Sequence, residues 1–248
     1  MKMYIMNTTP LLHMLKRACA LLEPSRMVHV EKIKQEKKKV QGVGAGLLLL
    51  YGIYEERIAL ERQGIPKKNL QDATEESGIN ASAIEVSVVE LIELLEGMSE
   101  NELALLHQMA ICHTAQNGKP YLTNIADLYF SISHSEEYVA CVMADYVVGA
   151  DIQNMKEIDR KRVAKRMLHT KENPSLSENA VSFFTCWSAK EAYVKMTGEG
   201  LSKDFRELVL DMKNEAFGVV EDTAKKQRAE VRVFSAPAGY VLAAVDGT

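Results

Sequence analysis

The stretch FFTCWSAKEAYVKMTGEGLS, residues 183–202, places a carboxylate and an amine where a helix should bury carbon. Residues three and four apart share one face of a helix, so Glu191 and Lys195 lie together. Both project from the middle of an apolar arc, which is formed by Val181, Phe183, Phe184, Trp187, Ala192 and Val194. A buried charge is costly unless a metal ion, a phosphate or a second carboxylate compensates it. The alternative is an ordinary Glu–Lys pair on a solvated face.

Residues 147–153, VVGADIQ, offer the second carboxylate. The alternation of a strand divides them into a core face, with Val148, Ala150 and Ile152, and an opposite face, with Gly149, Asp151 and Gln153. Gly149 leaves room beside the two oxygen-bearing side chains, so Asp151 is a candidate metal ligand. The alternative is that Asp151 ends a half-exposed strand and contacts only water.

Two further segments carry groups that suit phosphate oxygens. Ser133 and His134 follow a strand, and short donors with backbone amides at a turn can bind an anion. A histidine in this position is often only structural. Gly118, Lys119 and Pro120 form a turn that would by itself be an ordinary loop.

Composition narrows the class of protein. The chain has 248 residues, of which 47% are hydrophobic and 26% charged, and its net charge of −4 does not favour nucleic-acid binding. The longest uncharged apolar run, residues 43–53, is about half as long as a membrane span. The scattered cysteines form no disulfide framework and no zinc site, which suits a reducing cytosol; they are Cys19, Cys112, Cys141 and Cys186. We therefore expect a cytoplasmic protein that binds neither nucleic acid nor membrane.

The expected elements indicate an α+β fold with two similar halves, residues 1–146 and 147–248. Strands are predicted at residues 1–6, 128–133, 138–144, 147–153, 229–236 and 239–245, the last two as a hairpin. Helices are predicted at residues 10–22 and 37–53, and a basic helix at 156–172. Residues 71–106 contain nine Asp or Glu and no Lys or Arg. They predict an acidic helical insertion in the first half, whose second helix starts with a capping pattern at Ser99.

The ordered set GKPYL, FSISHS, VGADIQ and WSAKEAYVKMTGEGLS resembles the 4′-phosphopantetheinyl transferases of the surfactin-synthetase-activating type. The resemblance is detailed from Gly118 to Ser202. It implies two α+β halves related by a pseudo-twofold axis, with coenzyme A in the cleft between them. It also implies Mg²⁺-dependent transfer of the phosphopantetheine arm to a serine of an acyl or peptidyl carrier protein, with release of adenosine 3′,5′-bisphosphate.

The resemblance assigns roles to individual residues. Asp151 and Glu191 match metal-binding carboxylates. Gln153 stands where many relatives have a further acidic residue, and its neutral amide can still ligate the metal or hold a metal-bound water. Lys195 matches the lysine that meets the α-phosphate. Glu191 is also expected to serve as the general base, directly or through a water molecule. Its neighbour Lys190 is expected to contact substrate or solvent rather than metal.

The remaining expected contacts are with the coenzyme and the carrier protein. Ser133 and His134 match phosphate contacts, Lys119 and Pro120 match the stretch that lines the adenine, and Arg26 is a further candidate in the first half. The basic helix could guide an acidic carrier protein, or it could be only a solvated face. The internal repeat predicts a monomer. The alternative function is that of a non-catalytic relative that binds coenzyme A or a carrier protein, and a coincidental α+β interaction module is a third possibility.

Overall fold

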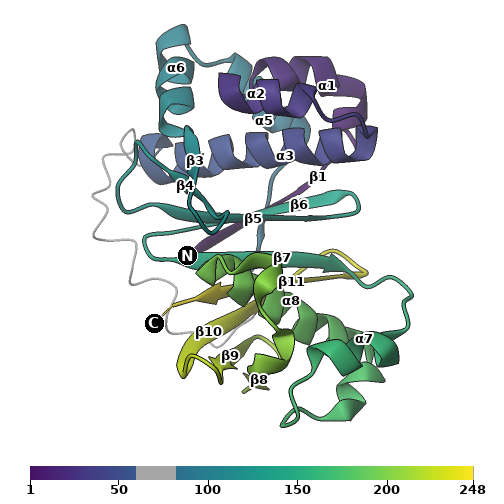
Figure 1. Ribbon diagram of the computed structural model, residues 1–248. Coiled ribbons are helices and arrows are strands. Elements are labelled where there is room, and N and C mark those ends of the chain that lie inside the picture. The colour runs from purple at the N-terminus through teal and green to yellow at the C-terminus, as the bar shows by residue number, and fades with distance from the viewer. Residues whose placement is uncertain (60–81, 248) are drawn as a thin grey trace.

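The computed structural model describes residues 1–59 and 82–247, and Figure 1 shows them as four layers. A layer of helices at the top covers one sheet, this sheet faces a second sheet, and helix α8 (Ala180–Thr197) lies below the second sheet. None of the described helices combines the length and the apolar character that crossing a membrane requires.

The first sheet has the strand order β2-β1-β6-β5. Its strands are β1 (Lys2–Asn7), β2 (Ile84–Glu85), β5 (Tyr129–Ser135) and β6 (Tyr138–Ala144). β6 pairs antiparallel with both β1 and β5, whereas β2 pairs parallel with β1. β5 therefore forms one edge of this sheet.

Five α-helices and a π-helix of the described chain belong to the upper layer. They are α1 (Leu11–Ala20), α2 (Pro24–Glu31), α3 (Glu36–Ile53), the π-helix η1 (Tyr54–Ala59), α5 (Val88–Glu96) and α6 (Glu100–Met109). α2 begins where Glu23 accepts hydrogen bonds from the backbone of Ser25 and Arg26, with Pro24 in the first turn. The apolar residues 43–53 bury most of α3 against the sheet, as expected for a helix that is hydrophobic all round.

The second sheet has the strand order β7-β11-β10-β9-β8, and all neighbouring strands are antiparallel. Its strands are β7 (Val148–Asn154), β8 (Leu208–Met212), β9 (Phe217–Asp222), β10 (Gln227–Phe234) and β11 (Tyr240–Asp246). Shorter elements connect them: α7 (Arg160–Met167) and the 3-10 turns η4 (Pro174–Ser177), η5 (Gly200–Ser202) and η6 (Phe205–Glu207). β7 forms the edge of this sheet that lies beside β5 in Figure 1.

Mostly small and β-branched side chains fill the space between the two sheets, together with a few larger ones such as Phe234 and Tyr240. The contributing residues of the first sheet are Met3, Ile5, Ala140, Val142 and Ala144, and those of the second include Val148, Ala150, Ile152, Leu242 and Ala244. The edge strands β5 and β7 are in contact beside this core.

The predicted strands are confirmed within one or two residues, and so is the β10–β11 hairpin, whose turn has Gly239 at a φ of 84°. The capping box at Ser99 and Glu102 is also confirmed. Five strands of the described chain were not predicted: β2, β8 and β9, and the two strands of a separate small sheet, β3 (Cys112–Thr114) and β4 (Pro120–Leu122). The strands of the first sheet come from residues 2–144 and those of the second from 148–246, whereas the pseudo-twofold axis stays a prediction.

Two expected helical segments differ in the structure. The basic helix is shorter than predicted: it begins at Arg160, because Asp159 accepts the backbone N–H of Arg162, and it ends at Met167. The predicted acidic insertion lies partly outside the described residues. Its described part forms β2, α5 and α6, and α5 buries four side chains in the same core as α3; these are Val88, Leu91, Ile92 and Leu95.

Candidate active site

Asp151, Lys195 and Ser133 form a closed triangle of hydrogen bonds between β7, α8 and β5. The Lys195 ammonium donates to Asp151 Oδ1 and to Ser133 Oγ, both at 2.7 Å. Ser133 Oγ in turn donates to Asp151 Oδ1, also at 2.7 Å. Only 3% of the Asp151 side chain is exposed, compared with 31% for Lys195. The strand aspartate and the helix lysine that the sequence predicted to act together are therefore in direct contact, and Asp151 is not at a solvated strand end.

Gly149 explains how helix α8 comes so close to β7. A Cβ atom at this position would lie 2.0 Å from the Ala192 carbonyl oxygen and 2.5 Å from the Met196 nitrogen. Since no real side chain tolerates such distances, only glycine allows this packing. The space that we predicted beside Asp151 and Gln153 is thus filled by the helix backbone, and this brings Lys195 within reach of Asp151.

Glu191 lies one helical turn before Lys195 and is half-buried. Burial raises the pKa of its carboxyl group, and the negative charge of Asp151 raises this pKa further. The Lys195 ammonium and a hydrogen bond from the Trp187 indole act in the opposite direction. The site therefore holds two carboxylates close enough to repel each other, one of which binds a proton more readily than an ordinary glutamate.

Alternate serines of β5 direct their hydroxyl groups at β7. Ser131 Oγ accepts the backbone N–H of Ala150 at 3.1 Å, and Ser135 Oγ accepts that of Asn154 at 2.9 Å. Together with Ser133 they join the edge strands of the two sheets on both sides of Asp151. We predicted no role for Ser131 and Ser135, although the spacing of two residues along SISHS places them on the same strand face as Ser133.

His134 and Gln153 lie at the border of this cluster. Desolvation and the nearby Lys195 ammonium lower the pKa of His134, so the imidazole is mainly neutral near pH 7. Gln153 donates a hydrogen bond from Nε2 to Asp151 Oδ2 at 3.0 Å. In this orientation the amide nitrogen of Gln153, and not its oxygen, faces the Asp151 carboxylate.

The predicted coenzyme residues of the first half are placed in two different regions. Lys119 and Pro120 lie between the first sheet and the end of α8, where Lys119 Nζ donates to the Met196 carbonyl at 2.7 Å and to the Val148 carbonyl at 3.2 Å. Arg26 lies on α2, where its side chain packs over Gly46 of α3 and hydrogen-bonds Cys112. The described contacts of Arg26 are thus with the upper helical layer and not with the Asp151–Lys195 cluster.

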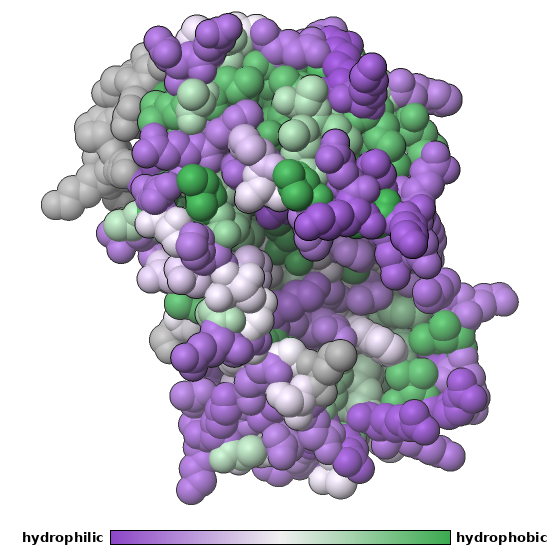
Figure 2. Space-filling model, turned by 45° about the horizontal axis from the view of Figure 1, so that its top comes forward, coloured by the Kyte–Doolittle hydropathy of each residue, from purple (hydrophilic) through white to green (hydrophobic). Residues whose placement is uncertain are grey.

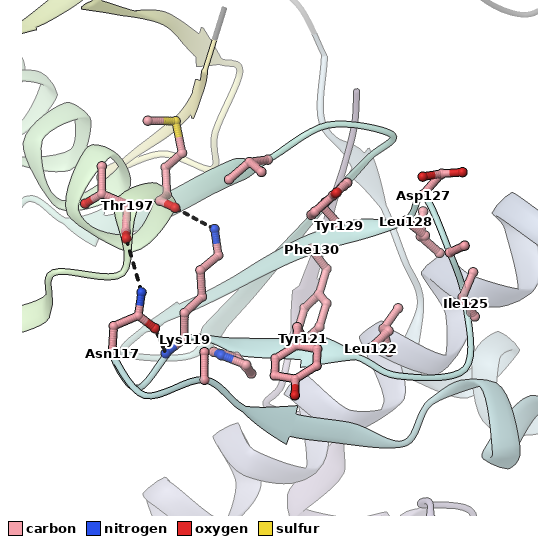
Figure 3. Close-up of a pocket in the computed structure, with 15 residues that line it drawn as sticks. Asn117, Lys119, Tyr121, Leu122, Ile125, Asp127, Leu128, Tyr129, Phe130 and Thr197 are labelled. Carbon is pink, nitrogen blue, oxygen red and sulfur yellow. Dashed lines mark hydrogen bonds between the residues drawn. The ribbon is translucent and has the colours of Figure 1, made fainter. Parts of the chain in front are cut away.

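A cavity of about 530 Å³ adjoins the cluster. Its lining includes Gly118, Lys119, Pro120, Ile132, Glu191 and Lys195. In Figure 2 the surface is hollowed between the two halves, and hydrophilic side chains line the hollow. A neighbouring cavity of about 520 Å³, drawn in Figure 3, shares Lys119, Pro120 and Phe130 with the first. The charged residues of the site therefore face an open space of the size that small-molecule sites usually have.

Lys190 corrects one prediction. Its side chain is fully buried and contacts neither the cavity nor solvent. The ammonium pairs with Glu172 at 2.6 Å and donates to the Met167 carbonyl at 2.9 Å. Glu172 also accepts the backbone N–H of Leu210. This ion pair fastens the segments before and after α8 to the helix, so Lys190 has a structural role in the protein interior.

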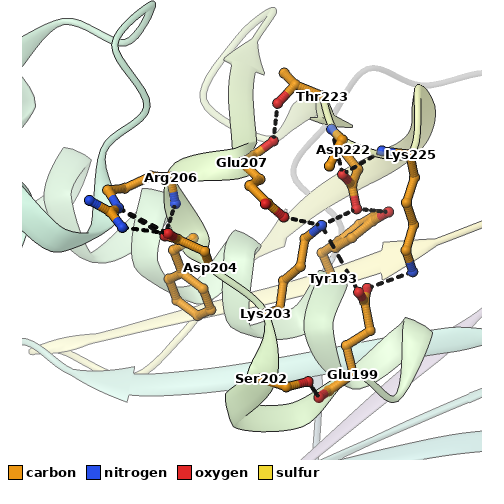
Figure 4. A network of polar contacts seen from close by, with 12 residues as sticks. Tyr193, Glu199, Ser202, Lys203, Asp204, Arg206, Glu207, Asp222, Thr223 and Lys225 are labelled. Atoms are coloured by element: carbon orange, nitrogen blue, oxygen red, sulfur yellow. Dashed lines mark hydrogen bonds and ion pairs between the residues drawn. The ribbon is translucent and has the colours of Figure 1, made fainter.

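A second polar network holds the loop that follows α8 (Figure 4). The Lys203 side chain, only 3% exposed, pairs with Asp222 at 2.6 Å and with Glu207 at 2.8 Å. The Tyr193 hydroxyl donates to the same Asp222 at 3.2 Å, which links the loop to the middle of α8. Lys203 also lines the cavity beside Glu191, so the network fixes one wall of the site.

The fit of a divalent cation can be judged from the donor set. Among the residues that the structure describes, no three Asp, Glu, His or Cys side chains come together as a metal site. Asp151 and Glu191 do lie close enough to repel each other. Mg²⁺ is commonly held by one or two carboxylates, with water and phosphate oxygens completing its shell. The two carboxylates are donors of the type that such a site uses. Both oxygens of Asp151 accept hydrogen bonds from Lys195, Ser133 and Gln153, so a cation bound there would replace at least one of these donors.

Comparisons with known proteins agree with the motifs. Residues 147–245 match the family model of the 4′-phosphopantetheinyl transferase superfamily. The 4′-phosphopantetheinyl transferase gsp of Aneurinibacillus migulanus is 36% identical over 115 residues, which are 44% of this chain and 47% of the relative. The transferase psf-1 of Bacillus pumilus is 36% identical over 104 residues, 40% of this chain and 44% of the relative.

The transferase Sfp of Bacillus subtilis (strain 168) is 27% identical over 135 residues, 52% of this chain and 60% of the relative. The chain thus spans about half the length of the curated relatives that it matches. The resemblance that the motifs predicted is confirmed for this part of the chain. Residues 147–245, which match the model of the 4′-phosphopantetheinyl transferase superfamily, contain both Asp151 and the Glu191–Lys195 pair.

Proposed function

We propose that this protein transfers the 4′-phosphopantetheine arm of coenzyme A to a serine of an acyl or peptidyl carrier protein and releases adenosine 3′,5′-bisphosphate. One observation carries the proposal: Lys195 bridges Asp151 and Ser133 beside Glu191, at a cavity on the matched domain. An ammonium and two carboxylates at one point suit a diphosphate with its counter-cation. They do not suit an ordinary solvated ion pair.

In the proposed reaction the serine hydroxyl oxygen attacks the phosphorus that carries the pantetheine arm. A new oxygen–phosphorus bond forms, and the bond from this phosphorus to the bridging oxygen of the diphosphate breaks. The leaving oxygen stays on the adenosine bisphosphate. Lys195 has three N–H donors and uses two within the protein, so one remains to neutralise the charge that develops on this leaving group.

The proton of the serine hydroxyl must be accepted as the new bond forms. We assign this role to Glu191, directly or through a water molecule, because its carboxylate faces the cavity and its pKa is raised. A raised pKa makes the carboxylate a stronger base than an ordinary glutamate. The proton then passes from Glu191 to solvent.

Asp151 and Glu191 would hold Mg²⁺, with phosphate oxygens and water as its other ligands. When bound, Mg²⁺ withdraws charge from the diphosphate that is attacked. Gln153 would act on this site through its hydrogen bond to Asp151, or as a ligand after rotation of its amide.

Coenzyme A would occupy the cavity beside these residues. The neutral His134 offers an N–H donor for phosphate oxygens, and Ser133 would offer its hydroxyl proton once it releases Asp151. Lys119 and Pro120 line the space assigned to the adenine. Arg26 has no supporting contact in this cluster, so its role in coenzyme binding stays a prediction. The cytoplasmic location and the monomeric state also stay predictions.

The direct test is a transfer assay. The purified protein is incubated with an apo carrier protein, coenzyme A and Mg²⁺, and the carrier is weighed by mass spectrometry. The proposal expects a mass increase equal to one phosphopantetheine group on the carrier serine. Coenzyme binding without any mass increase on several fatty-acid, polyketide and peptide carriers would contradict the proposal.

That result would favour a second candidate, a non-catalytic relative that binds coenzyme A or a carrier protein. Two observations favour this candidate. Gln153 is neutral where the resemblance leads us to expect an acidic residue, and the described contacts of Arg26 lie outside the Asp151–Lys195 cluster. The retained contact between Asp151 and Lys195 favours the enzyme.

A further inference from the structure

The loop from Asn117 to Lys119 crosses from the first half to the second. It joins β3 (Cys112–Thr114) to β4 (Pro120–Leu122), and its side chains reach the C-terminal end of α8. Asn117 Nδ2 donates to the Thr197 carbonyl at 3.3 Å, and Lys119 Nζ donates to the Met196 carbonyl at 2.7 Å. Figure 3 shows both bonds between the loop and the helix end.

These acceptors are carbonyl groups that the helix itself leaves without partners. α8 ends at Thr197, and Gly198 follows in the left-handed conformation with a φ of 75°. The last carbonyls of a helix need external donors, and a positive charge at that end also interacts favourably with the helix dipole. Asn117 and Lys119, from the other half of the protein, supply these donors and the positive charge. A Cβ atom at Gly198 would lie 2.2 Å from Asn117 Nδ2, so the loop rests directly on the helix end.

The Lys119 ammonium joins two elements that carry the site. Its second acceptor is the Val148 carbonyl at the start of β7, three residues before Asp151. Met196 directly follows Lys195. One amine therefore holds the strand of the aspartate and the helix of the lysine at a fixed separation.

The donors of Lys119 are directed at the protein and not at a ligand. Both acceptors are backbone carbonyls, and among the described residues no carboxylate forms an ion pair with Lys119. Burial without such a partner lowers the pKa of this amine to about 8. A lysine that served an anionic coenzyme would be expected to present its charge to the cavity.

We propose that Asn117 and Lys119 form an interdomain clasp that holds the end of α8 against β7 and thereby positions Lys195 and Glu191 opposite Asp151. Lys119 is then a positioning residue, not a phosphate ligand. The predicted effect of the clasp on catalysis rests on the transferase function proposed above. The clasp itself is a property of the free protein and can be tested without turnover.

The test compares Lys119→Met, which keeps the aliphatic stem and removes the amine, with Lys119→Arg and with Lys16→Met as the control. Lys16 is exposed on α1, far along the chain from the site. Hydrogen–deuterium exchange of the full-length free protein is measured at residues 194–198 and 148–150. Coenzyme A affinity is measured by calorimetry, and the transfer assay supplies kcat and KM.

The clasp predicts that Lys119→Met speeds exchange at both segments and lowers kcat by about tenfold, as the loss of a hydrogen bond from a charged donor would. Coenzyme affinity should stay within about twofold of the wild-type value, because the amine does not contact the ligand. Lys119→Arg, which can still donate to both carbonyls, should restore kcat, and Lys16→Met should change nothing. If Lys119→Met does not fold, Asn117→Ala tests the clasp through a weaker change: it should speed hydrogen–deuterium exchange at residues 194–198 only.

Unchanged exchange at the end of α8 together with a coenzyme affinity reduced by about tenfold would overturn the clasp and make Lys119 a ligand-binding residue. Unchanged exchange with unchanged affinity would overturn it as well. If the wild-type chain transfers nothing to any carrier, the proposed function fails, and the exchange data alone still decide for or against the clasp.

Discussion

The Lys195 ammonium interacts with both carboxylates of the site. It donates to Asp151 and Ser133, and it opposes the rise in the pKa of Glu191 that burial and Asp151 cause. Two carboxylates without this ammonium would repel each other in a poorly solvated cleft. The proposed function therefore places one further cation beside the two carboxylates and a phosphate ligand on Lys195.

Substitution of Glu191 tests its assignment as base and metal ligand. We expect Glu191→Gln to lower the transfer rate by at least about 10²-fold, because an amide neither accepts the serine proton nor balances a divalent cation. The melting temperature should stay equal or rise slightly, since burial and Asp151 disfavour the ionised carboxyl group. Glu157→Gln, at an exposed acidic residue, is the control. A rate for Glu191→Gln close to that of the wild type would refute the assignment.

Lys119 predicts a pH dependence of stability. Its pKa is about 8 in the folded protein and near the ordinary value of 10.5 in the unfolded chain. Between these values the unfolded state binds more protons, so the free energy of unfolding should rise with pH across this window relative to Lys119→Met. Urea unfolding of both proteins at about pH 7 and about pH 10 measures this difference. A difference that is constant, or that shrinks as the pH rises, would contradict the burial of this amine.

At the scale of elements, the contact of β7 with α8 depends on Gly149. We expect Gly149→Ala to destabilise the protein by about 2 kcal/mol or more, because the methyl group collides with the Ala192 carbonyl of α8. The strand must shift, so turnover should fall as Asp151 moves away from Lys195. Gly42→Ala in α3 is the matched control: its Cβ would meet only side chains at 3.4 Å, and alanine favours helices. Chemical unfolding and the transfer assay measure both effects.

The loop after α8 depends on the Lys203 network. Removing one partner of a buried ion pair leaves the other charge uncompensated, so Lys203→Met should cost about 3 kcal/mol of folding free energy. Lys213→Met, at an exposed pair with Asp211, should change the stability by no more than about 0.5 kcal/mol. Equal melting temperatures of the two variants would show that the network contributes nothing to stability.

The sequence predicted those parts of the site that follow from a regular repeat. Asp151, Glu191 and Lys195 were found because strand and helix periodicities define which residues share a face. Lys190 was misplaced for the opposite reason: its partner Glu172 lies in an irregular segment between α7 and α8, and no periodicity relates the two. The role of Gly149 was likewise missed, because a close approach of two elements depends on tertiary packing.

The same limit applies to the elements themselves. The six predicted strands alternate or form continuous apolar runs, and the structure confirms them. β8 and β9 escaped prediction because their apolar runs, LVL and FGVV, are short and end at charged residues. The ends of α7 were set by a capping aspartate and by the turn after Met167, which composition alone did not reveal.

At the scale of the whole molecule, two sheets meet face to face and their edge strands β5 and β7 carry the site between them. The exposed face of α7 lies on the second half and presents Lys161, Arg162, Lys165 and Arg166. Carrier proteins are usually acidic, so this face is suited to attract them over the distance of about 10 Å at which charges act in dilute salt.

Charge reversal on α7 tests this proposed docking face. Lys165→Glu should raise the KM for an acidic carrier by about tenfold at low ionic strength and leave the coenzyme KM unchanged. The difference in carrier KM between Lys165→Glu and the wild type should become smaller as salt is added, because salt screens the attraction. Lys16→Glu on α1 is the control of equal charge change. An effect on the carrier KM that is the same for both variants would argue against α7 as the docking face.

The most direct measurement is a crystal structure of the protein with coenzyme A and Mn²⁺, whose anomalous scattering locates the metal. We expect the diphosphate to lie against the Lys195 ammonium, with the metal between this diphosphate and the carboxylates of Asp151 and Glu191. A diphosphate bound elsewhere, with Lys195 still donating only to Asp151 and Ser133 and no metal on either carboxylate, would contradict the proposed site.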